Sequence, residues 1–317
     1  GKSFSFTVKS EKVSVSDFKL LYDVTGVSVG LNDRNSQAYK YLIRTEAATD
    51  DGNGKKLQKF TITIPKQADD RRVPIDIQIY IRNSESYNYY QMITLRSRPD
   101  YNGMAGLQPV KVGGIFWAPV NVGQTDIAGS TTPSLANWGY HFQYGRNKGF
   151  DPEKTDYEKL EGPVSYASVQ EPDGENMDKF ITRATGTGSS GVNTDWLDVS
   201  NTADVAIRDA LWSKNVNDSP CPTGWRLPNK AEGEVLSQKY NKSLTVQNGR
   251  IEIAGDEPGK TFYLTAAGQR SRASGNVITT NTSYWLIDGN SLSIKPDNSA
   301  MGAGYYSYGY FLRCIQE

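Results

Sequence analysis

The sequence predicts a mainly β and α+β protein of two domains, an N-terminal β-sandwich and a larger α+β domain with long loops. Three observations predict this class. The chain has 317 residues, which is more than one hydrophobic core usually serves, so two domains are expected. It is rich in Gly (30) and Tyr (19), a composition typical of strands and turns rather than of helical bundles. Its first third contains short segments in which apolar and polar residues alternate.

The alternating segments define the expected N-terminal domain, residues 1–105. They are FSFTV (residues 4–8), FTITI (60–64) and IDIQIYI (75–81), and YYQMITLRS follows as a late strand. A two-residue period places one face of a strand in a core and the other in water. Short strands at this spacing suggest a sandwich of about 100 residues. Pro, Asp, Asn and Gly concentrate in RSRPDYNGMAG, so we place the boundary there and begin the second domain, 106–317, at its last residue.

The second expected domain contains all six Trp residues, both Cys residues and long loops rich in Gly, Asn and Ser. Two helices are expected in it, and this small number indicates an α+β domain. The second helix covers about residues 230–240, with Asn229 as its N-cap and Glu232 as the capping-box partner. The first covers about residues 202–212, and its inward face is expected to carry Val205, Ala206, Asp209 and Trp212.

Charge and hydropathy exclude several classes of partner. Lys plus Arg and Asp plus Glu both number 35, so the formal net charge is zero. Nothing in this balance draws the chain to nucleic acid, to anionic lipid or to a strongly acidic substrate. No apolar run approaches the ~20 residues of a transmembrane helix. The opening GKSFSFTVKS is typical of a strand and not of an export signal.

The two cysteines, Cys221 and Cys314, allow two interpretations. A reactive thiol would need a nearby base, and His141 is the only histidine in the chain. A disulfide would tie the C-terminal strand to the start of a helix, stabilise the fold by about 4–5 kcal/mol and indicate an oxidising compartment. The disulfide is the favoured interpretation.

Metal and cofactor motifs are sparse, and no cofactor is expected. There is no CxxC and no HExxH, so a zinc site is not expected. Calcium is the one metal left open, because ATDDGNGKK (residues 48–56) offers Asp50, Asp51 and Asn53. The segment lacks the distal Glu of an EF-hand loop, and Asp-Gly-Asn-Gly favours a hairpin turn.

Catalytic motifs are equally sparse. GTGSSG (residues 186–191) is not followed by Lys-Ser/Thr, so a flexible loop is favoured over a phosphate-binding loop. No GxSxG elbow is present, and no catalytic residue is assigned. Carboxylate pairs such as Asp195/Asp198 and Glu252/Asp256 leave glycoside hydrolysis open without supporting it.

Aromatic residues in loops are the most suggestive functional feature. GYHFQYGR (residues 139–146), TSYWLIDG (282–289) and GAGYYSYGYFLRC (302–314) place Tyr and Trp beside small residues. Such side chains join flat apolar area to a polar group, as sugar- and protein-binding surfaces require, although many must also pack the core. The expected ligand-binding residues are Tyr144, Trp196, Asp256, Arg270, Tyr284, Trp285, Tyr305 and Tyr306.

Six blocks in the second domain together resemble a known family. They are GGIFWAPVNVG, GYHFQYGR, Trp212 shortly before PCPTGWRLPNKAE, YLTAAGQRS, SYW and the terminal YGYFLRCIQE. In this order they resemble the Fibrobacter-type major paralogous domain, a module of surface lipoproteins of Bacteroidetes. The resemblance covers about residues 107–317, and CPTGWRLP with the terminal RC is its most specific pair.

The resemblance implies a C-type-lectin-like fold in which Cys221 pairs with Cys314. Within CPTGWRLPNKAE, Trp225 and Leu227 are expected in the core. One departure is Gly233, where relatives carry a large apolar residue, and its low helix propensity is expected to cost ~1 kcal/mol. Trp117 and Trp212 complete the expected structural core.

The resemblance also argues against two activities of related folds. Calcium-dependent sugar binding would need a Glu/Gln-Pro-Asn/Asp motif after the CPTGWRLP block and a later Trp-Asn-Asp. Glu171-Pro172-Asp173 lies before that block, Glu257-Pro258-Gly259 lacks the amide, and no Trp-Asn-Asp exists. The formylglycine-generating enzymes need a redox-active cysteine pair, whereas both cysteines here fall at structural positions.

The first 105 residues resemble, more loosely, fimbrillin-like or immunoglobulin-like modules. Together the two resemblances imply a non-enzymatic surface adhesin that binds a glycan or an extracellular protein, such as an accessory or tip component of a pilus in contact with other pilus subunits. Its expected location is the extracellular face of the outer membrane, as a lipoprotein or pilus component whose export signal lies outside this chain. The alternatives are a glycan-processing enzyme with loop carboxylates and a purely structural component of a surface assembly.

Overall fold

The chain divides after Pro99 into two units, Gly1–Pro99 and Asp100–Glu317. The computed structural model describes the strands of the first unit together with residues 52 and 74. From residue 98 onward it describes 98–125, 138–170, 172–183, 194–212, 219–239, 250–266, 268–279, 281–294 and 299–317. Strands predominate, and the described residues form only two α-helices, so the protein has the mainly β and α+β fold that the sequence predicts.

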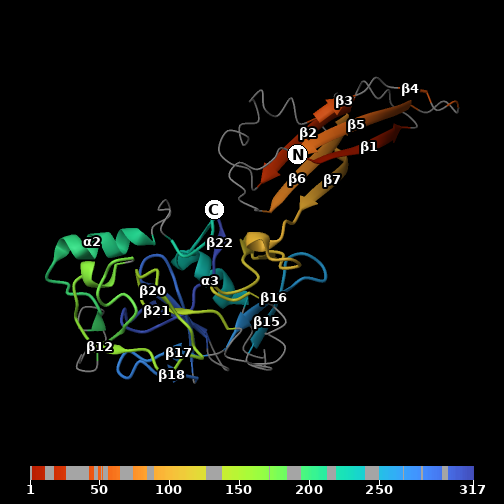
Figure 1. Ribbon diagram of the computed structural model, residues 1–317. Coiled ribbons are helices and arrows are strands. Elements are labelled where there is room, and N and C mark those ends of the chain that lie inside the picture. Colours follow the sequence, from red (N-terminus) through yellow and green to blue (C-terminus); the bar gives the residue numbers. More distant parts are fainter. Residues whose placement is uncertain are drawn as a thin grey trace. The chain divides into compact units, whose positions relative to one another are not determined.

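The first unit contains two antiparallel sheets (Figure 1). In one, β5 pairs with β1, β3 and β4, and in the other β6 lies between β2 and β7. The alternating segments of the sequence form β1, β5 and β6, as expected from their two-residue period. The strands are β1 (Lys2–Ser10), β2 (Phe18–Thr25), β3 (Ile43–Thr45), β4 (Thr49–Asp50), β5 (Lys56–Ile64), β6 (Ile75–Asn83) and β7 (Tyr89–Ser97).

The segment with the open calcium hypothesis lies between β4 and β5. These strands pair antiparallel, and Asp50 lies opposite Lys56, as in the predicted hairpin. Most of the proposed turn, residues 51 and 53–55, lies outside the described residues, as does GTGSSG at 186–191. The calcium hypothesis at this turn therefore remains a prediction.

The second unit begins several residues before the expected boundary at residue 106. Tyr101 is buried, and its backbone N–H donates to the carbonyl of Leu107 at 2.6 Å. Its ring meets the ring of Trp225 edge-on, with centroids 4.9 Å apart. The turn-rich segment thus contributes to the packing of the second unit and is not a free linker.

The described residues of the second unit form small sheets and two α-helices. Its α-helices are α2 (Thr202–Leu211) and α3 (Lys230–Lys239), and its short 3-10 turns are η3 (Tyr101–Gly103) and η6 (Ala167–Val169). Its strands are β8 (Val110–Val112), β9 (Ile115–Trp117), β10 (His141–Phe142), β11 (Gly149–Phe150), β12 (Lys159–Glu161), β13 (Phe180–Thr182), β14 (Trp225–Arg226), β15 (Arg250–Ala254), β16 (Thr261–Thr265), β17 (Gln269–Arg270), β18 (Val277–Ile278), β19 (Thr282–Trp285), β20 (Asn290–Ile294), β21 (Ser299–Ala303) and β22 (Ile315–Gln316).

A four-stranded sheet, β14–β22–β9–β8, joins the two ends of the second unit. The C-terminal strand β22 lies between β14 and β9, opposite Trp225 and Trp117. The main core cluster packs on this sheet, on the β15–β16 hairpin and on the β19–β20–β21 sheet. Trp117, at 1% exposure, lies in this cluster with its ring centroid 5.9 Å from that of Phe262.

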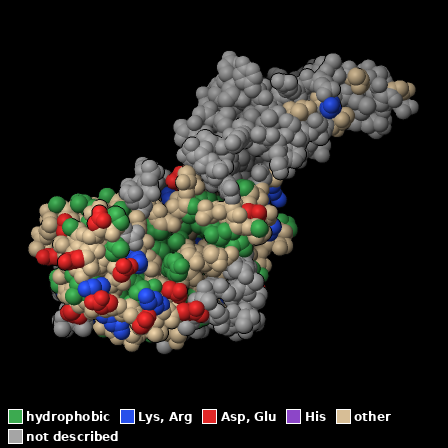
Figure 2. Space-filling view, in the orientation of Figure 1, with side chains coloured by type: hydrophobic (Ala, Val, Ile, Leu, Met, Phe, Trp, Pro, Cys, Tyr) green, Lys and Arg blue, Asp and Glu red, His purple; other side chains and the backbone are tan. Residues whose placement is uncertain are grey.

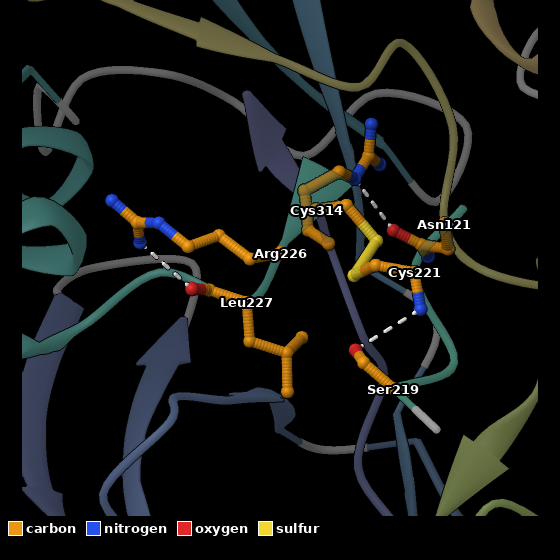
Figure 3. The surroundings of a disulfide bond; sticks show 7 residues. Asn121, Ser219, Cys221, Arg226, Leu227 and Cys314 are labelled. Carbon is orange, nitrogen blue, oxygen red and sulfur yellow. Dashed lines mark hydrogen bonds between the residues drawn. A yellow bond between two sulfur atoms is a disulfide. The ribbon is translucent and has the colours of Figure 1, made fainter. Parts of the chain in front are cut away.

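The segment CPTGWRLPNKAE forms the corner that the sequence predicts. The Cys221–Cys314 disulfide is present (Figure 3). Trp225 and Leu227 are buried at 3% and 0% exposure, and the backbone N–H of Cys221 donates to Ser219 Oγ at 3.3 Å. The disulfide therefore joins the loop before β14 to the residue that precedes β22, the strand with which β14 pairs.

A capping box starts α3, as predicted. The backbone N–H of Glu232 donates to Asn229 Oδ1 at 2.9 Å, and the backbone N–H of Asn229 donates to Glu232 Oε2 at 2.8 Å. Arg226 adds two hydrogen bonds to the Glu232 carboxylate, at 2.7 and 2.6 Å. Gly233 is buried, and a Cβ there would lie only 3.1 Å from the Leu286 side chain and 3.2 Å from Met301. The glycine that departs from the resembled family therefore permits close packing of the helix.

The inward face of α2 differs from the expected one. Trp212 is buried at 1% exposure, as predicted, but Ala206 and Asp209 are exposed. Arg208 is instead the buried side chain within the helix. Burial of Arg208 was not expected because a charged side chain lies in water unless it is paired, and its buried partner, Asp195, lies outside the helix.

Candidate functional site

The structure buries most of the side chains that were assigned to a ligand-binding surface. Trp196 and Trp285 have 0% exposure, and Tyr144, Arg270 and Tyr284 have at most 3%. The prediction that these five residues line ligand-binding loops is wrong, because side chains with almost no accessible surface cannot contact a ligand. Of the remaining expected residues, Asp256 is exposed, and Tyr305 and Tyr306 are partly exposed.

The buried aromatic residues join distant loops through their polar groups. Trp285 Nε1 donates to the carbonyl of Phe142 at 2.7 Å, and Trp196 Nε1 donates to the carbonyl of Tyr144 at 2.9 Å. The Tyr144 hydroxyl donates to the carbonyl of Ile287 at 2.8 Å. These bonds connect residues 52 or 143 positions apart, so the aromatic side chains organise the core of a loop-rich domain.

Arg270 likewise holds loops together instead of facing solvent. Its guanidinium donates to the carbonyls of Gly275 at 2.7 Å, Asp151 at 2.8 Å and Lys154 at 3.2 Å. Burial lowers the pKa of Arg270, and the charges of Tyr157 and Asp151 oppose this effect. All of these hydrogen bonds are internal to the protein, so Arg270 has a structural role.

Asp195, one of the carboxylates left open for catalysis, belongs to a buried ion pair. It accepts hydrogen bonds from the Arg208 guanidinium and, at 3.0 Å, from the backbone N–H of Leu197. Burial raises the pKa of the Asp195 carboxyl, while the positive charge of Arg208 acts in the opposite direction. Since the two side chains are only 2% and 3% exposed, Asp195 does not lie in a surface loop.

The two other candidate carboxylates accept hydrogen bonds within turns. Asp256 accepts from the backbone N–H groups of Gly113 at 3.0 Å and Gly114 at 2.6 Å, and so closes the turn between β8 and β9. Asp198 accepts from the Ser200 backbone N–H and hydroxyl, and these bonds lower the pKa of Asp198. Each of these acids thus has a local structural role.

His141 is buried at 0% exposure, with its ring centroid 4.3 Å from that of Phe311. Burial lowers the pKa of His141 to about 3, the positive charge of Arg270 lowers it as well, and the backbone of Gly268 acts in the opposite direction. The imidazole is therefore neutral at physiological pH and closed to solvent. Neither cysteine offers a thiol that His141 could activate, because both are in the disulfide.

The neutral, buried His141 should make the second unit less stable as the pH falls below about 6.5. Between its unfolded pKa near 6.5 and its folded pKa of about 3, the unfolded chain binds one more proton than the folded chain. The free energy of unfolding should then fall by roughly 1.5 kcal/mol between pH 6.5 and 5.0. Denaturant titrations read by tryptophan fluorescence report on this unit alone, since it holds all six Trp residues.

The control for this pH dependence is His141→Gln, because the variant lacks the only histidine in the chain. Its absolute stability can change, but its free energy of unfolding should vary much less over the same pH interval. An equal pH slope in both proteins would show that carboxylates, and not His141, determine the effect.

No metal centre is found among the residues that the structure describes. In that part of the chain, no group of three or more His, Cys, Asp or Glu side chains is arranged to hold a metal ion. Also within the described residues, no helix is both long enough and apolar enough to span a bilayer.

Two tyrosines and two arginines at the surface form the best candidate binding site. Tyr305 and Tyr308 are partly exposed, with ring centroids 5.7 Å apart and ring planes inclined by 47°. The Arg272 guanidinium carbon lies 6.0 Å from the Tyr305 ring centroid, and Arg183 bonds directly to Arg272. We call these four residues the tyrosine–arginine patch. Of the four, the sequence singled out only Tyr305.

Hydrogen bonds hold the tyrosine–arginine patch in place. Arg183 and Arg272 exchange two bonds of 2.7 Å, one between backbone groups and one from the Arg272 guanidinium to the Arg183 carbonyl. The backbone N–H of Tyr308 donates to the carbonyl of Tyr305 at 2.8 Å. Between them, Ser307 donates both its N–H (3.0 Å) and its hydroxyl (2.6 Å) to the carbonyl of Thr194. The patch is therefore pre-organised by its backbone.

A small cleft of about 180 Å³ also lies in this unit, apart from the patch. Its wall includes Arg146, whose guanidinium donates to Gln143 Oε1 at 2.7 Å and to the carbonyl of Met177 at 2.8 Å. A cleft of this volume has room for several water molecules or a small polar group. Its lining residues are Gly145, Arg146, Asn147, Tyr166, Val169, Gln170 and Leu211.

Charged side chains of both signs are intermixed over the visible face of the second unit (Figure 2). This agrees with the zero formal net charge of the chain. Comparison with known proteins gives no match, since no family model, no curated protein and no solved structure matches the chain. The family resemblance of residues 107–317 therefore remains a hypothesis.

Proposed function

We propose that this protein is a non-enzymatic binding protein of the extracellular surface, an adhesin that captures a glycan or a protein through the tyrosine–arginine patch. The observation that carries the proposal is the patch itself. Rigidly held tyrosine rings provide apolar contact area at low entropic cost, and their hydroxyls remain available as polar groups. Partly exposed arginines beside aromatic rings are typical of interaction hot spots.

The disulfide supports an extracytoplasmic location. Disulfides persist in oxidising environments and are rare in reducing ones. Cys221 and Cys314 are both bonded, and both are buried in the second unit. A surface lipoprotein or a pilus component in contact with other subunits is the specific form of this proposal.

The roles of the acids favour binding over catalysis. Asp195 is buried against Arg208, and Asp256 closes the Gly113–Gly114 turn. Catalysis by loop carboxylates would require these side chains to leave their present hydrogen bonds. A glycan-processing enzyme is therefore the weaker proposal. Turnover assays on the same purified protein test it.

The test is a glycan and protein array probed with the wild-type chain and with the double variant Tyr305→Ala/Tyr308→Ala. For each array ligand that the wild-type protein binds, the signal of the double variant should be at least tenfold lower. The matched control is Tyr140→Ala, because Tyr140 is also a surface tyrosine, at 40% exposure, and lies outside the patch.

Three outcomes would contradict the proposal. Ligands retained by the double variant would place the binding surface elsewhere. A wild-type protein without array ligands would favour a purely structural component. Turnover of host or plant polysaccharides that is abolished by Asp195→Ala, Asp198→Ala or Asp256→Ala in folded protein would make it an enzyme.

A further inference from the structure

Tyr305 and Tyr308 form a pair of surface phenols held at short range. Their ring centroids are 5.7 Å apart, their planes are inclined by 47°, and both side chains are partly exposed. A backbone hydrogen bond of 2.8 Å from the Tyr308 N–H to the Tyr305 carbonyl fixes the spacing of the two residues. We propose that this pair is an oxidative modification site, at which a one-electron oxidant couples the two phenol rings into dityrosine. Such a site goes beyond the proposed binding function and requires no bound ligand.

The inclination and exposure of the two rings suit this coupling. The new bond joins the ring carbons next to the two hydroxyls, so the edges of the rings must meet. The Tyr305 and Tyr308 rings are inclined and not stacked, so a rotation of the side chains brings their edges together. Side chains that reach solvent change rotamer within nanoseconds, so this rotation is available to both residues.

The two other tyrosine–tyrosine contacts among the described residues are unsuited to coupling. Tyr144 and Tyr306 are closer, at 4.5 Å between centroids, but their rings are stacked with only 26° between the planes. Tyr144 is buried and its hydroxyl donates to a backbone carbonyl at 2.8 Å, so its ring cannot turn an edge toward Tyr306. Tyr308 and Tyr310 are 5.7 Å apart, but Tyr310 is only 4% exposed and is held by its packing.

A row of aromatic rings leads from the core to the surface pair. Trp285 lies 4.4 Å from Tyr310, and Tyr310 lies 5.7 Å from Tyr308, measured between ring centroids. Electrons pass between rings at such distances, so an oxidised ring in this row can be reduced by its neighbour. Burial raises the pKa of the Tyr310 hydroxyl, and a buried phenol has no bulk water to take its proton. Tyr305 and Tyr308 reach solvent, so the oxidised state should come to rest on them.

The coupling removes two electrons and two protons from the protein. Each phenol gives one electron to the oxidant and its hydroxyl proton to water, which leaves two phenoxyl radicals. The radicals pair their electrons in one carbon–carbon bond between a Cε atom of each ring. The hydrogen on each joined carbon then leaves as a proton, and each oxygen takes up a proton, so both hydroxyls are restored. The product is lighter than the starting protein by two hydrogen atoms.

The experiment oxidises wild-type protein with photo-oxidised tris(bipyridine)ruthenium, a one-electron oxidant, and persulfate serves as the final electron acceptor. The protein is kept dilute so that coupling between chains is rare. Dityrosine is detected by its blue fluorescence and located by mass spectrometry of the tryptic peptides. We expect one main product, a monomer that is two hydrogen atoms lighter. Its peptide should give no fragment ions from the peptide bonds between Tyr305 and Tyr308, because the new bond holds such fragments together.

Variants that keep the ring and remove the hydroxyl identify the partners. Tyr305→Phe and Tyr308→Phe should each lower the dityrosine signal at least tenfold, because a ring without the hydroxyl forms no phenoxyl radical. The matched control is Tyr140→Phe, which removes a surface phenol of 40% exposure outside the pair and should leave the signal unchanged. The tryptophan-fluorescence unfolding midpoint establishes that each variant is folded. Wild-type protein unfolded in urea should give a mixture of tyrosine pairs instead of one.

Three results would overturn the proposal. Undiminished dityrosine in both phenylalanine variants of the pair would place the coupling elsewhere. The same mixture of pairs in folded and unfolded protein would show that proximity in the sequence, and not the fold, selects the partners. Tyrosine oxidation without dityrosine, or with dityrosine only in dimers, would show that the two rings of one chain do not meet. The proposed function is decided separately, by the array and the double tyrosine variant.

Discussion

Removing the Cys221–Cys314 disulfide should lower the free energy of unfolding of the second unit by about 4–5 kcal/mol. The bond closes a loop between positions 93 residues apart, and the loss of conformational entropy in the unfolded chain grows with loop length. It also fixes the approach of β14 to the C-terminal strand β22, which pairs with both β14 and β9. Without the bond, the C-terminus would be held by these short strand pairings, by burial of Ile315 and by the hydrogen bonds of Arg313 to Asn121 and Ala118.

The measurement is denaturant unfolding of wild-type protein and of Cys221→Ala/Cys314→Ala, each with and without dithiothreitol. Reductant should lower the stability of the wild-type protein and have no effect on the double variant. Tryptophan fluorescence confines the readout to the second unit. If the free energies of unfolding of the wild-type protein and the double variant differ by less than about 1 kcal/mol, the unfolded chain is already compact around this loop.

The same bond gives a simple test of the compartment. Wild-type protein should be purified from its native source, denatured without reductant and treated with a thiol reagent. No cysteine should be labelled, because both are in the disulfide. Labelling of two thiols per chain would remove the argument for an oxidising environment.

Features set by local sequence were predictable. The capping box at Asn229 and Glu232 depends on residues three positions apart, so its pattern is visible without the fold. The alternation of Phe60–Ile64 within β5 is equally local. Trp225 and Leu227 were expected in the core from the family resemblance of the segment CPTGWRLPNKAE, and both are buried.

The division of aromatic residues between core and surface was not predictable. Tyr305 and Tyr310 lie five positions apart in the same Gly- and Tyr-rich segment, yet Tyr310 is 4% exposed and Tyr305 is partly exposed. Loops have no period that assigns one face to solvent. What buries Tyr310 is the ring of Trp285, 4.4 Å away between centroids and 25 positions distant in sequence.

Buried arginines were also missed, for a related reason. Arg270 was expected in a ligand-binding loop, and arginine side chains are mostly exposed unless they are paired. Its actual partners are the carbonyls of Gly275, Asp151 and Lys154, and carbonyls carry no sequence signal. Arg272, two positions along, does belong to the surface patch, and only the fold distinguishes the two.

The buried pair of Asp195 and Arg208 should be the most sensitive polar contact of the second unit. Asp195→Ala leaves a buried guanidinium with Asp209 as its remaining carboxylate, and Asp209 is 49% exposed. Breaking such a pair typically costs 3–5 kcal/mol, so we expect a loss of about 4 kcal/mol in the free energy of unfolding. Arg208→Met should cost a similar amount, because it leaves Asp195 charged, buried and unpaired.

The controls use the same guanidinium. Asp209→Ala removes the partly exposed partner of Arg208 and should cost less than about 1 kcal/mol. The double variant Asp195→Asn/Arg208→Met should cost clearly less than the sum of Asp195→Ala and Arg208→Met, because neither charge is then left alone. If Asp209→Ala and Asp195→Ala lower the free energy of unfolding equally, burial does not determine how strongly Asp195 and Arg208 stabilise the fold.

This pair also connects the stability of the fold to the proposed binding surface. The Arg208 guanidinium lies over the Tyr306 ring, 4.6 Å from its centroid. Tyr306 lies between Tyr305 and Ser307 in the sequence. Asp195 follows Thr194, whose carbonyl accepts both hydrogen bonds from Ser307. Asp195→Ala should therefore weaken ligand binding at temperatures well below the unfolding midpoint, whereas Asp209→Ala should leave it unchanged. Calorimetric titration of both variants at 10 °C would measure this, and equal affinities would show that the pair stabilises the fold without positioning the patch.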